Sequence, residues 1–121
     1  MDPQLTLTVH RDGHGVVLRV GGEADLATAP QLHAKLVDLV ENGTGSIVVD
    51  LTPVAFIDST GLGALLAGHR RAHARGHTIR LVCPEGQTLR VLRLTGMDMV
   101  LPVYSSLVEA LGAQPDDADT D

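Results

Sequence analysis

The sequence predicts an α/β fold in which a mixed β-sheet is covered by crossover helices. Residues 5–9 alternate apolar and polar side chains, and residues 16–20 form a second strand-like segment beyond the turn residues Asp12-Gly13. This arrangement predicts an antiparallel hairpin. After the hairpin, segments with leucines at helical spacing alternate with short apolar runs. Because that alternation requires crossover connections, we expect a mixed sheet of about five strands covered by about four helices.

Cap and stop residues predict the helix boundaries. Residues 28–31 read Thr-Ala-Pro-Gln, which predicts a helix start with the threonine as its cap and a stop at Asn42-Gly43. A second helix is expected over about residues 59–75, with Gly76 as the first residue beyond its end. Two shorter helices are expected at residues 89–94 and at residues 105–111, the latter with Ser105 as its cap.

Three further strands follow from short apolar runs. Their predicted positions are residues 46–51, residues 78–83 and an edge strand at residues 99–101, where Pro102 limits further pairing. We assign residues 4–112 to one domain, and we expect the acidic residues 113–121 to be a disordered tail.

Composition indicates an aliphatic core without disulfides. The chain has 121 residues, of which 44% are hydrophobic and 2% aromatic. A chain of this length buries roughly two-thirds of its unfolded surface, which is enough for a core without covalent staples. The single cysteine, Cys83, has no internal partner, so we interpret it as a small core residue in a protein from a reducing compartment.

Charge and hydropathy disfavour several functional classes. The net charge is −6, and neither the domain nor the tail is basic, so direct nucleic-acid binding is disfavoured. The scarcity of aromatic residues also argues against base stacking. The sequence has no N-terminal signal pattern and no apolar run near 18 residues, which predicts a cytoplasmic protein without a membrane span.

The segment from Val54 to Gly63 carries the main candidate site. Ser59 stands where an apolar run ends and a helical pattern begins, and Gly61 follows closely. One interpretation is that Ser59 is an ordinary helix N-cap. The other is that it is a phosphoacceptor, because a helix start tolerates the ~1.5–2 negative charges of a phosphate. Like charges brought together across an interface cost several kcal/mol, so phosphorylation should spare the fold and break a complex.

The polar residues of this region also allow other interpretations. Ser59 as a catalytic nucleophile is disfavoured, because Ile57 occupies the position of the first glycine in a Gly-x-Ser-x-Gly elbow. Glu23 and Asp25 are either solvated loop acids or residues of a site at the strand ends. Sequence position alone leaves both interpretations open.

The histidines raise the possibility of a metal site. His69 and His73 are four residues apart on one predicted helix, which suits a pair of ligands. Glu or Cys ligands at a suitable spacing are missing nearby, and the surrounding arginines fit a solvated basic helix end. We therefore expect neither a metal nor a cofactor.

Three motifs in order resemble the STAS-domain anti-sigma factor antagonist family. Asp58-Ser59-Thr60-Gly61-Leu62-Gly63 looks like the family signature, and Gly22-Glu23-Ala24-Asp25 looks like its Gly-Glu-x-Asp segment. Leu94-Thr95-Gly96-Met97 looks like its Leu-x-Gly-Leu segment before the last strand. The similarity spans roughly residues 5–112 and implies a STAS-like mixed sheet covered by helices.

The resemblance also implies a partner-switching function. In the family, the serine that matches Ser59 is phosphorylated by an anti-sigma factor that is itself a serine kinase. The unphosphorylated antagonist binds this anti-sigma factor and releases the sigma factor, and a metal-dependent serine phosphatase restores it. The antagonist is not an enzyme. Thr60 is a second possible acceptor, because many members have a second serine there.

The family role carries over to a set of partner-binding residues near the acceptor. They are Glu23, Asp25, Asp58, Thr60, Gly61, Leu62 and Gly63. Two alternatives remain: a STAS subunit of a lipid-transport or stress-sensing complex in which Ser59 is only a helix cap, and an enzyme or anion-binding module that uses the helix start.

Overall fold

A computed structural model of the protein describes residues 4–12, 15–42 and 45–113. The predicted tail beyond residue 113 and the expected stop residue Gly43 lie outside the described residues.

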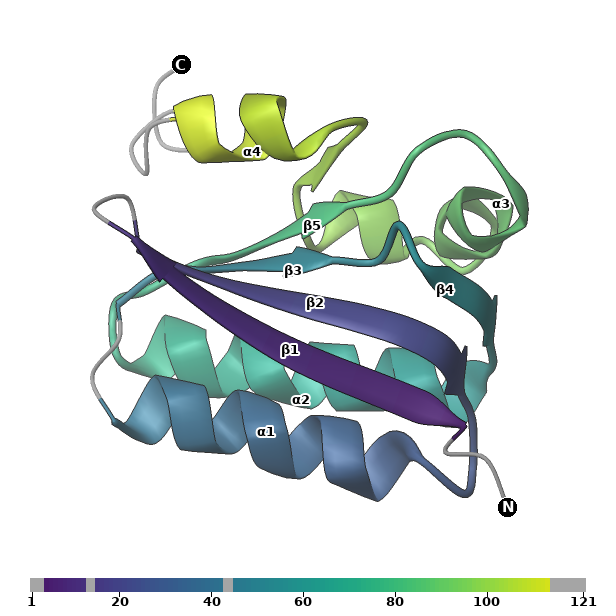
Figure 1. Ribbon diagram of the computed structural model, residues 1–121, viewed down its shortest axis with the longest axis horizontal. Helices are drawn as coiled ribbons and strands as arrows, with labels where there is room; N and C mark the ends of the chain where they lie inside the picture. The colour runs from purple at the N-terminus through teal and green to yellow at the C-terminus, as the bar shows by residue number, and fades with distance from the viewer. Residues whose placement is uncertain (1–3, 13–14, 43–44, 114–121) are drawn as a thin grey trace.

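Six strands form one mixed sheet (Figure 1). They are β1 (Leu5–Asp12), β2 (Gly15–Ala24), β3 (Ile47–Asp50), β4 (Val54–Ile57), β5 (Ile79–Val82) and β6 (Val103–Tyr104). β1 and β2 pair antiparallel, as the predicted hairpin, and the other pairs are parallel. The strand order is β1-β2-β3-β5-β6, and β4 pairs with the far end of β2.

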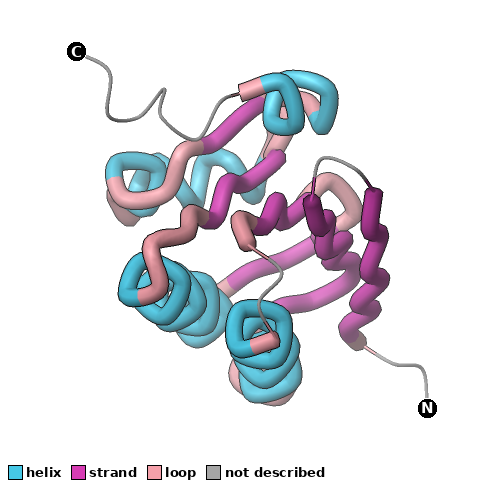
Figure 2. Tube along the Cα trace, turned by 90° about the vertical axis from the view of Figure 1, so that its left-hand side faces the viewer, coloured by secondary structure: helices cyan, strands magenta, loops and turns pink. Residues whose placement is uncertain are grey.

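The helices are separated by the sheet into two groups. They are α1 (Ala29–Glu41), α2 (Ser59–Ala74), α3 (Gln87–Leu94) and α4 (Leu107–Gly112), with a 3₁₀ turn, η1 (Met97–Met99). α1 and α2 lie side by side on one face of the sheet, and α4 lies on the other (Figure 1). Figure 2 shows the first two helices nearly end-on, as a layer against the strands. The expected mixed α/β fold is therefore confirmed, with six strands where about five were predicted.

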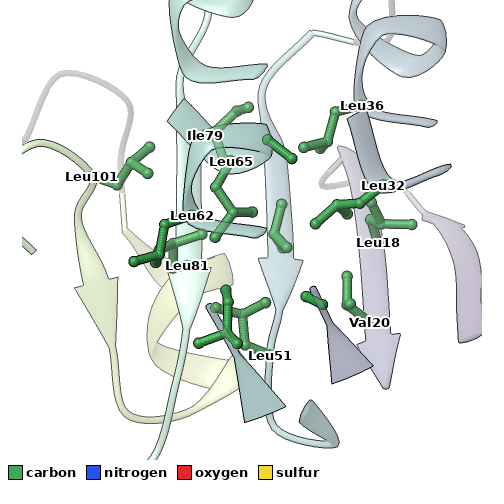
Figure 3. Close-up of a cluster of buried hydrophobic side chains, with 14 of the residues drawn as sticks. Leu18, Val20, Leu32, Leu36, Leu51, Leu62, Leu65, Ile79, Leu81 and Leu101 are labelled. Carbon is green, nitrogen blue, oxygen red and sulfur yellow. The ribbon is translucent and has the colours of Figure 1, made fainter. Parts of the chain in front are cut away.

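The core lies mainly between the sheet and the layer of α1 and α2. Leu32 and Leu36 of α1 and Leu65 of α2 have no exposed surface and meet Leu18 and Leu81 of the sheet (Figure 3). Each buried leucine contributes about 1.5–3 kcal/mol, so this aliphatic layer fixes the position of the start of α2. A smaller cluster fills the α4 face and consists of Val17, Val48, Val82 and Ala110.

Two strand predictions need correction. β4 was not predicted, because its four apolar residues lie shortly before α2 and the pairing with β2 that makes them a strand is not visible in the sequence. Residues 99–101 are not the edge strand: Gly96 has a φ of 78° and opens η1, which ends at Met99. The edge strand is β6, and Pro102 contributes to the pairing only through its carbonyl, which accepts a hydrogen bond from Leu81 N at 2.8 Å.

The end of α2 agrees with the prediction, and the cap of α4 does not. Gly76 ends α2 as expected, with a φ of 77° and hydrogen bonds from Gly76 N to His73 O and from His77 N to Ala72 O. Ser106 caps α4 in place of the predicted Ser105, because it has the extended backbone and accepts from Glu109 N at 3.2 Å.

Thr28 occupies the predicted N-cap position of α1, but its side chain makes no cap hydrogen bond. Its hydroxyl instead donates to the carbonyl oxygen of Glu23 at 2.7 Å. The threonine side chain therefore stabilises the loop before α1 and does not satisfy the free N–H groups at the helix start.

Candidate functional site

The parallel pairing of β2 with β4 joins two segments that are far apart in the sequence. Glu23 faces Phe56 and Ala24 faces Ile57 in the register of the two strands. The residue that follows β4, Asp58, donates its backbone N–H to the carbonyl oxygen of Ala24 at 3.1 Å. Glu23 at the end of β2 and Asp25 just after it therefore lie at the same edge of the sheet as the start of α2. This is the edge of the sheet where parallel strands end and where α/β folds place their sites.

Asp58, and not Ser59, is the N-cap of α2. Its backbone is extended (φ −115°, ψ −172°), and one carboxylate oxygen accepts from Thr60 N at 2.9 Å and from Gly61 N at 3.1 Å. The same oxygen accepts from the Thr60 hydroxyl at 2.5 Å. The carboxylate thus satisfies two of the free N–H groups at the helix start. The interpretation of Ser59 as a cap was wrong.

Hydrogen bonds stabilise the Asp58 carboxylate as an anion. The Thr60 hydroxyl and the Gly61 N–H, followed by the N–H groups of Thr60 and Leu26, lower the pKa of Asp58 against a smaller opposing effect of burial. Asp58 therefore carries a negative charge at neutral pH. Through its backbone N–H, which donates to Ala24 O, and its carboxylate, which caps α2, Asp58 connects the end of β2 to the start of α2.

Ser59 is the first residue of α2, and its side chain is exposed. Its hydroxyl makes no hydrogen bond to any residue in the described part of the chain. Thr60 differs, because it is half-buried and its hydroxyl donates to Asp58. The two adjacent hydroxyls are therefore distinguished by their surroundings: the one on Ser59 is accessible, and the one on Thr60 is engaged.

The loop after β2 is held in one conformation by its own side chains. Asp25 Oδ1 accepts from Ala27 N at 3.0 Å and from Thr28 N at 3.2 Å. The Thr28 hydroxyl accepts from Asp25 N at 2.9 Å while it donates to the Glu23 carbonyl. Asp25 is half-buried by these contacts, and Glu23 is exposed at the end of β2. Asp25 is thus a structural residue of the loop as well as one of its charges.

The glycines and leucine of the motif have different surroundings. Gly61 is buried, and a β-carbon there would lie 2.4 Å from the carbonyl oxygen of Ala24. Leu62 is 7% exposed and belongs to the core. Gly63 is exposed, and a β-carbon there would meet no atom within 4 Å. Gly61 and Leu62 therefore lie beneath the surface of the candidate site, and Gly63 forms part of that surface.

The histidine and cysteine candidates lie away from this site. The rings of His69 and His73 stack with centroids 6.0 Å apart, and burial, followed by the charges of His73 and Arg70, lowers the pKa of His69. A search of the described residues finds no group of three or more His, Cys, Asp or Glu side chains that could hold a metal ion. Cys83 is 2% exposed, as expected of a core residue, and burial raises its pKa to about 11.

Sequence reasoning missed two residues that shape the site. Leu26, between the loop acids and α1, is 75% exposed, which is unusual for a leucine in so ordered a loop. Thr28 holds that loop through its hydroxyl. For Leu26 the sequence offers only a weak signal, which is an apolar side chain directly after Asp25. For Thr28 it offers none beyond a cap-like position.

The part of the chain that the structure describes contains no helix that is both long and apolar enough to cross a membrane. A STAS domain family described as "Mlab, STAS domain" matches residues 7–109. The anti-sigma-F factor antagonist RsfB of Mycobacterium tuberculosis is 34% identical over 110 residues, which cover 88% of this chain and 87% of RsfB.

Solved structures show the same fold. The crystal structure of an anti-sigma factor antagonist from Mycobacterium paratuberculosis has a TM-score of 0.82 and 32% identity, over 88% of this chain and 91% of that one. The Bacillus cell fate determinant SpoIIAA in its phosphorylated form has a TM-score of 0.67 and 23% identity, over 88% of this chain and 96% of that one. The motifs, the sheet topology and these similarities lead to one conclusion: the chain belongs to the STAS domain family of anti-sigma factor antagonists.

Proposed function

We propose that this protein is an anti-sigma factor antagonist that is switched at Ser59. In its unphosphorylated form it binds an anti-sigma factor with serine kinase activity, and the sigma factor is released. Phosphorylation of Ser59 ends this binding. The observation that carries the proposal is the exposed, unengaged hydroxyl of Ser59 at the first position of α2, beside Asp58.

The chemistry of the switch lies in its partners, and this chain supplies the acceptor. The kinase transfers the γ-phosphoryl group of ATP to the Ser59 oxygen, which loses its proton, and ADP leaves. A metal-dependent serine phosphatase reverses the step, with water as the nucleophile and inorganic phosphate as the product. The antagonist itself acts by binding and not as an enzyme, and we place it in the cytoplasm. SpoIIAA, a more distant relative, has been solved in both phosphorylated and unphosphorylated forms.

The geometry favours Ser59 over Thr60 as the acceptor. A kinase must reach the hydroxyl oxygen, and Ser59 is exposed, whereas the Thr60 hydroxyl is held by Asp58. Transfer to Thr60 would break that hydrogen bond and place a phosphate against the Asp58 carboxylate. The solvent-exposed Ser59 hydroxyl can accept the phosphoryl group from kinase-bound ATP without changing the cap.

The electrostatics explain how the phosphate ends binding. Asp58 is an anion, and Glu23 and Asp25 lie at the same edge of the sheet. The carboxylate of Asp58 already occupies the N–H groups of Thr60 and Gly61, so the helix start offers a phosphate less compensation than an empty N-terminus would. The phosphate adds ~1.5–2 negative charges to an acidic surface, and juxtaposed like charges cost several kcal/mol across an interface.

The alternative function is a STAS subunit of a lipid-transport or stress-sensing complex in which Ser59 serves only as a helix cap. Asp58 is the N-cap of α2, so the role that this alternative assigns to Ser59 is already filled by another residue. Co-purification of the chain with a transporter ATPase, and not with a kinase, would favour it.

A binding experiment tests the proposed function. Ser59→Ala should bind a cognate anti-sigma kinase with wild-type affinity, and Ser59→Asp should bind at least about tenfold more weakly, equivalent to about 1.4 kcal/mol. Gln87→Asp is the matched control, because Gln87 is the exposed first residue of α3, and this variant should bind normally. Equal affinities of the two Ser59 variants would contradict the charge mechanism.

A further inference from the structure

An apolar hollow of about 340 Å³ opens between the starts of α1 and α2. It is lined by Leu26, Ala29, Pro30, His33, Thr60, Gly63 and Ala64. Thr60 follows Ser59 directly, so the hollow begins one residue from the proposed acceptor. The core does not require this space: Leu26 is 75% exposed, and Gly63 leaves the α2 wall without a side chain.

The walls of the hollow are formed before any partner arrives. On one side, the Asp25 carboxylate and the Thr28 hydroxyl fix the loop that presents Leu26. On the other, the Thr60 hydroxyl is held by the Asp58 carboxylate. Both walls are thus ordered by hydrogen bonds within the chain. A preformed apolar cavity binds an inserted side chain at a small entropic cost.

The charges beside the hollow define what can occupy it. Asp58 and Asp25 are joined to its walls by hydrogen bonds, and Glu23 is exposed at the end of the adjoining strand. An occupant must therefore offer an apolar side chain for the hollow and a cation for the acidic residues beside it. An acidic segment would place like charges against these carboxylates, and a purely polar one would not fill the apolar hollow.

Resting on the function proposed above, we propose that this hollow receives a hydrophobic anchor side chain of the anti-sigma factor, flanked there by lysine or arginine. The anchor holds the kinase beside α2, so the same contact supports both tight binding and delivery of the phosphoryl group to Ser59. Buried apolar anchors seated in pockets are the residues that dominate the affinity of protein interfaces.

The test fills the hollow and measures both activities. The probes are the serine-kinase anti-sigma factors encoded by the source organism, each purified and titrated with full-length protein. Gly63→Leu places a side chain in open space and should not disturb the fold, which a thermal melt checks. Ala74→Leu, at the exposed far end of α2, is the matched control. Leu26→Ser is a second variant that removes one apolar wall.

The expected results separate the anchor from the switch. Gly63→Leu and Leu26→Ser should each raise the Kd at least about tenfold and raise the KM for phosphorylation of Ser59 with little change in kcat, while Ala74→Leu stays at wild-type values. A Kd within twofold of wild type for both hollow variants would overturn the inference. If Ser59→Asp alone loses affinity, the proposed switch at Ser59 is supported although the anchor is not. If the wild-type protein binds none of the kinases, the proposed function fails together with the anchor. Dimerisation of the isolated chain that Gly63→Leu abolishes would assign the hollow to a second copy and overturn the inference as well.

Discussion

Gly61 lies so close to Ala24 that a β-carbon on the glycine would sit 2.4 Å from the alanine carbonyl oxygen. This contact joins the start of α2 to the end of β2, where Glu23 lies and after which Asp25 follows. A β-carbon would also lie 2.9 Å from Cγ1 of Ile57. Gly61 is therefore required by the close approach of two backbones, and the position of Ser59 relative to Glu23 depends on it.

Gly61→Ala should destabilise the protein. The backbone atoms of Ala24 cannot move away as a flexible side chain can, so we expect a loss of about 1–3 kcal/mol in the free energy of unfolding. In a domain of this size the Tm should fall by at least about 4 °C, measured by calorimetry. Gly63→Ala is the matched control, since its β-carbon meets open space and alanine has a helix propensity up to about 1 kcal/mol better than glycine. Changes of the same sign in the two variants would contradict the packing described here.

Asp58→Asn should change the pH dependence of stability. Hydrogen bonds from Thr60 and Gly61 lower the folded-state pKa of Asp58 below its ordinary value of 3.8. The carboxylate therefore contributes stability that is fully present above about pH 4 and is lost as the pH falls through the folded pKa. Asparagine can still cap the helix but cannot ionise.

The advantage in Tm of the wild type over Asp58→Asn should be largest at neutral pH and should shrink as the pH falls below 3.8. Thermal melts of the two proteins at several pH values measure it. Glu109, whose pKa is also lowered, is common to both proteins and cancels in the difference. A difference in Tm that stays constant from pH 7 to pH 3 would show that the charge of Asp58 has no part in the cap.

Cys83 should be inert in the folded protein. Burial raises the pKa of its thiol to about 11, so the reactive thiolate is scarce at pH 8, and the side chain is 2% exposed. Alkylation by iodoacetamide at pH 8 should be at least about a hundredfold slower in buffer than in denaturant. Comparable rates in the two solvents would place Cys83 at the surface.

Glu23 should contribute to the rate of association with the anti-sigma factor. It is an exposed acid beside the proposed interface, and such charges act mainly on the association rate constant and on its salt dependence. We expect Glu23→Gln to slow association about two- to tenfold at low salt, measured by stopped-flow fluorescence. Glu85→Gln, at an exposed acid before α3, should leave the rate unchanged. A slower rate in both variants would indicate a net-charge effect without a local interface.

Local patterns predicted the parts of the fold that local forces determine. The hairpin, the two long helices and the Gly76 stop follow from periodicity and cap chemistry. β4 and β6 were not predicted, because each is defined by its pairing, β4 with β2 and β6 with β5, and not by a pattern of its own. Asp58 and Ser59 are adjacent residues that can both cap a helix, and only the backbone conformation decided between them.

The candidate site was also predicted only in part. Ser59 and its neighbouring acids were found because they lie in short motifs. The hollow was not, because Leu26 and Gly63 lie on different elements and meet only through the packing of α1 against α2. The sequence motifs therefore identified the proposed phosphoacceptor but not the hollow beside it.

The most direct test of the central claim is to map the phosphate after the full-length protein is incubated with an anti-sigma kinase and ATP. Intact mass should rise by one phosphoryl group, and fragment spectra should place it on Ser59. Ser59→Ala should abolish the incorporation, and Thr60→Ala should retain it. Absence of phosphate from Ser59 in the presence of a kinase that binds the protein would contradict the account.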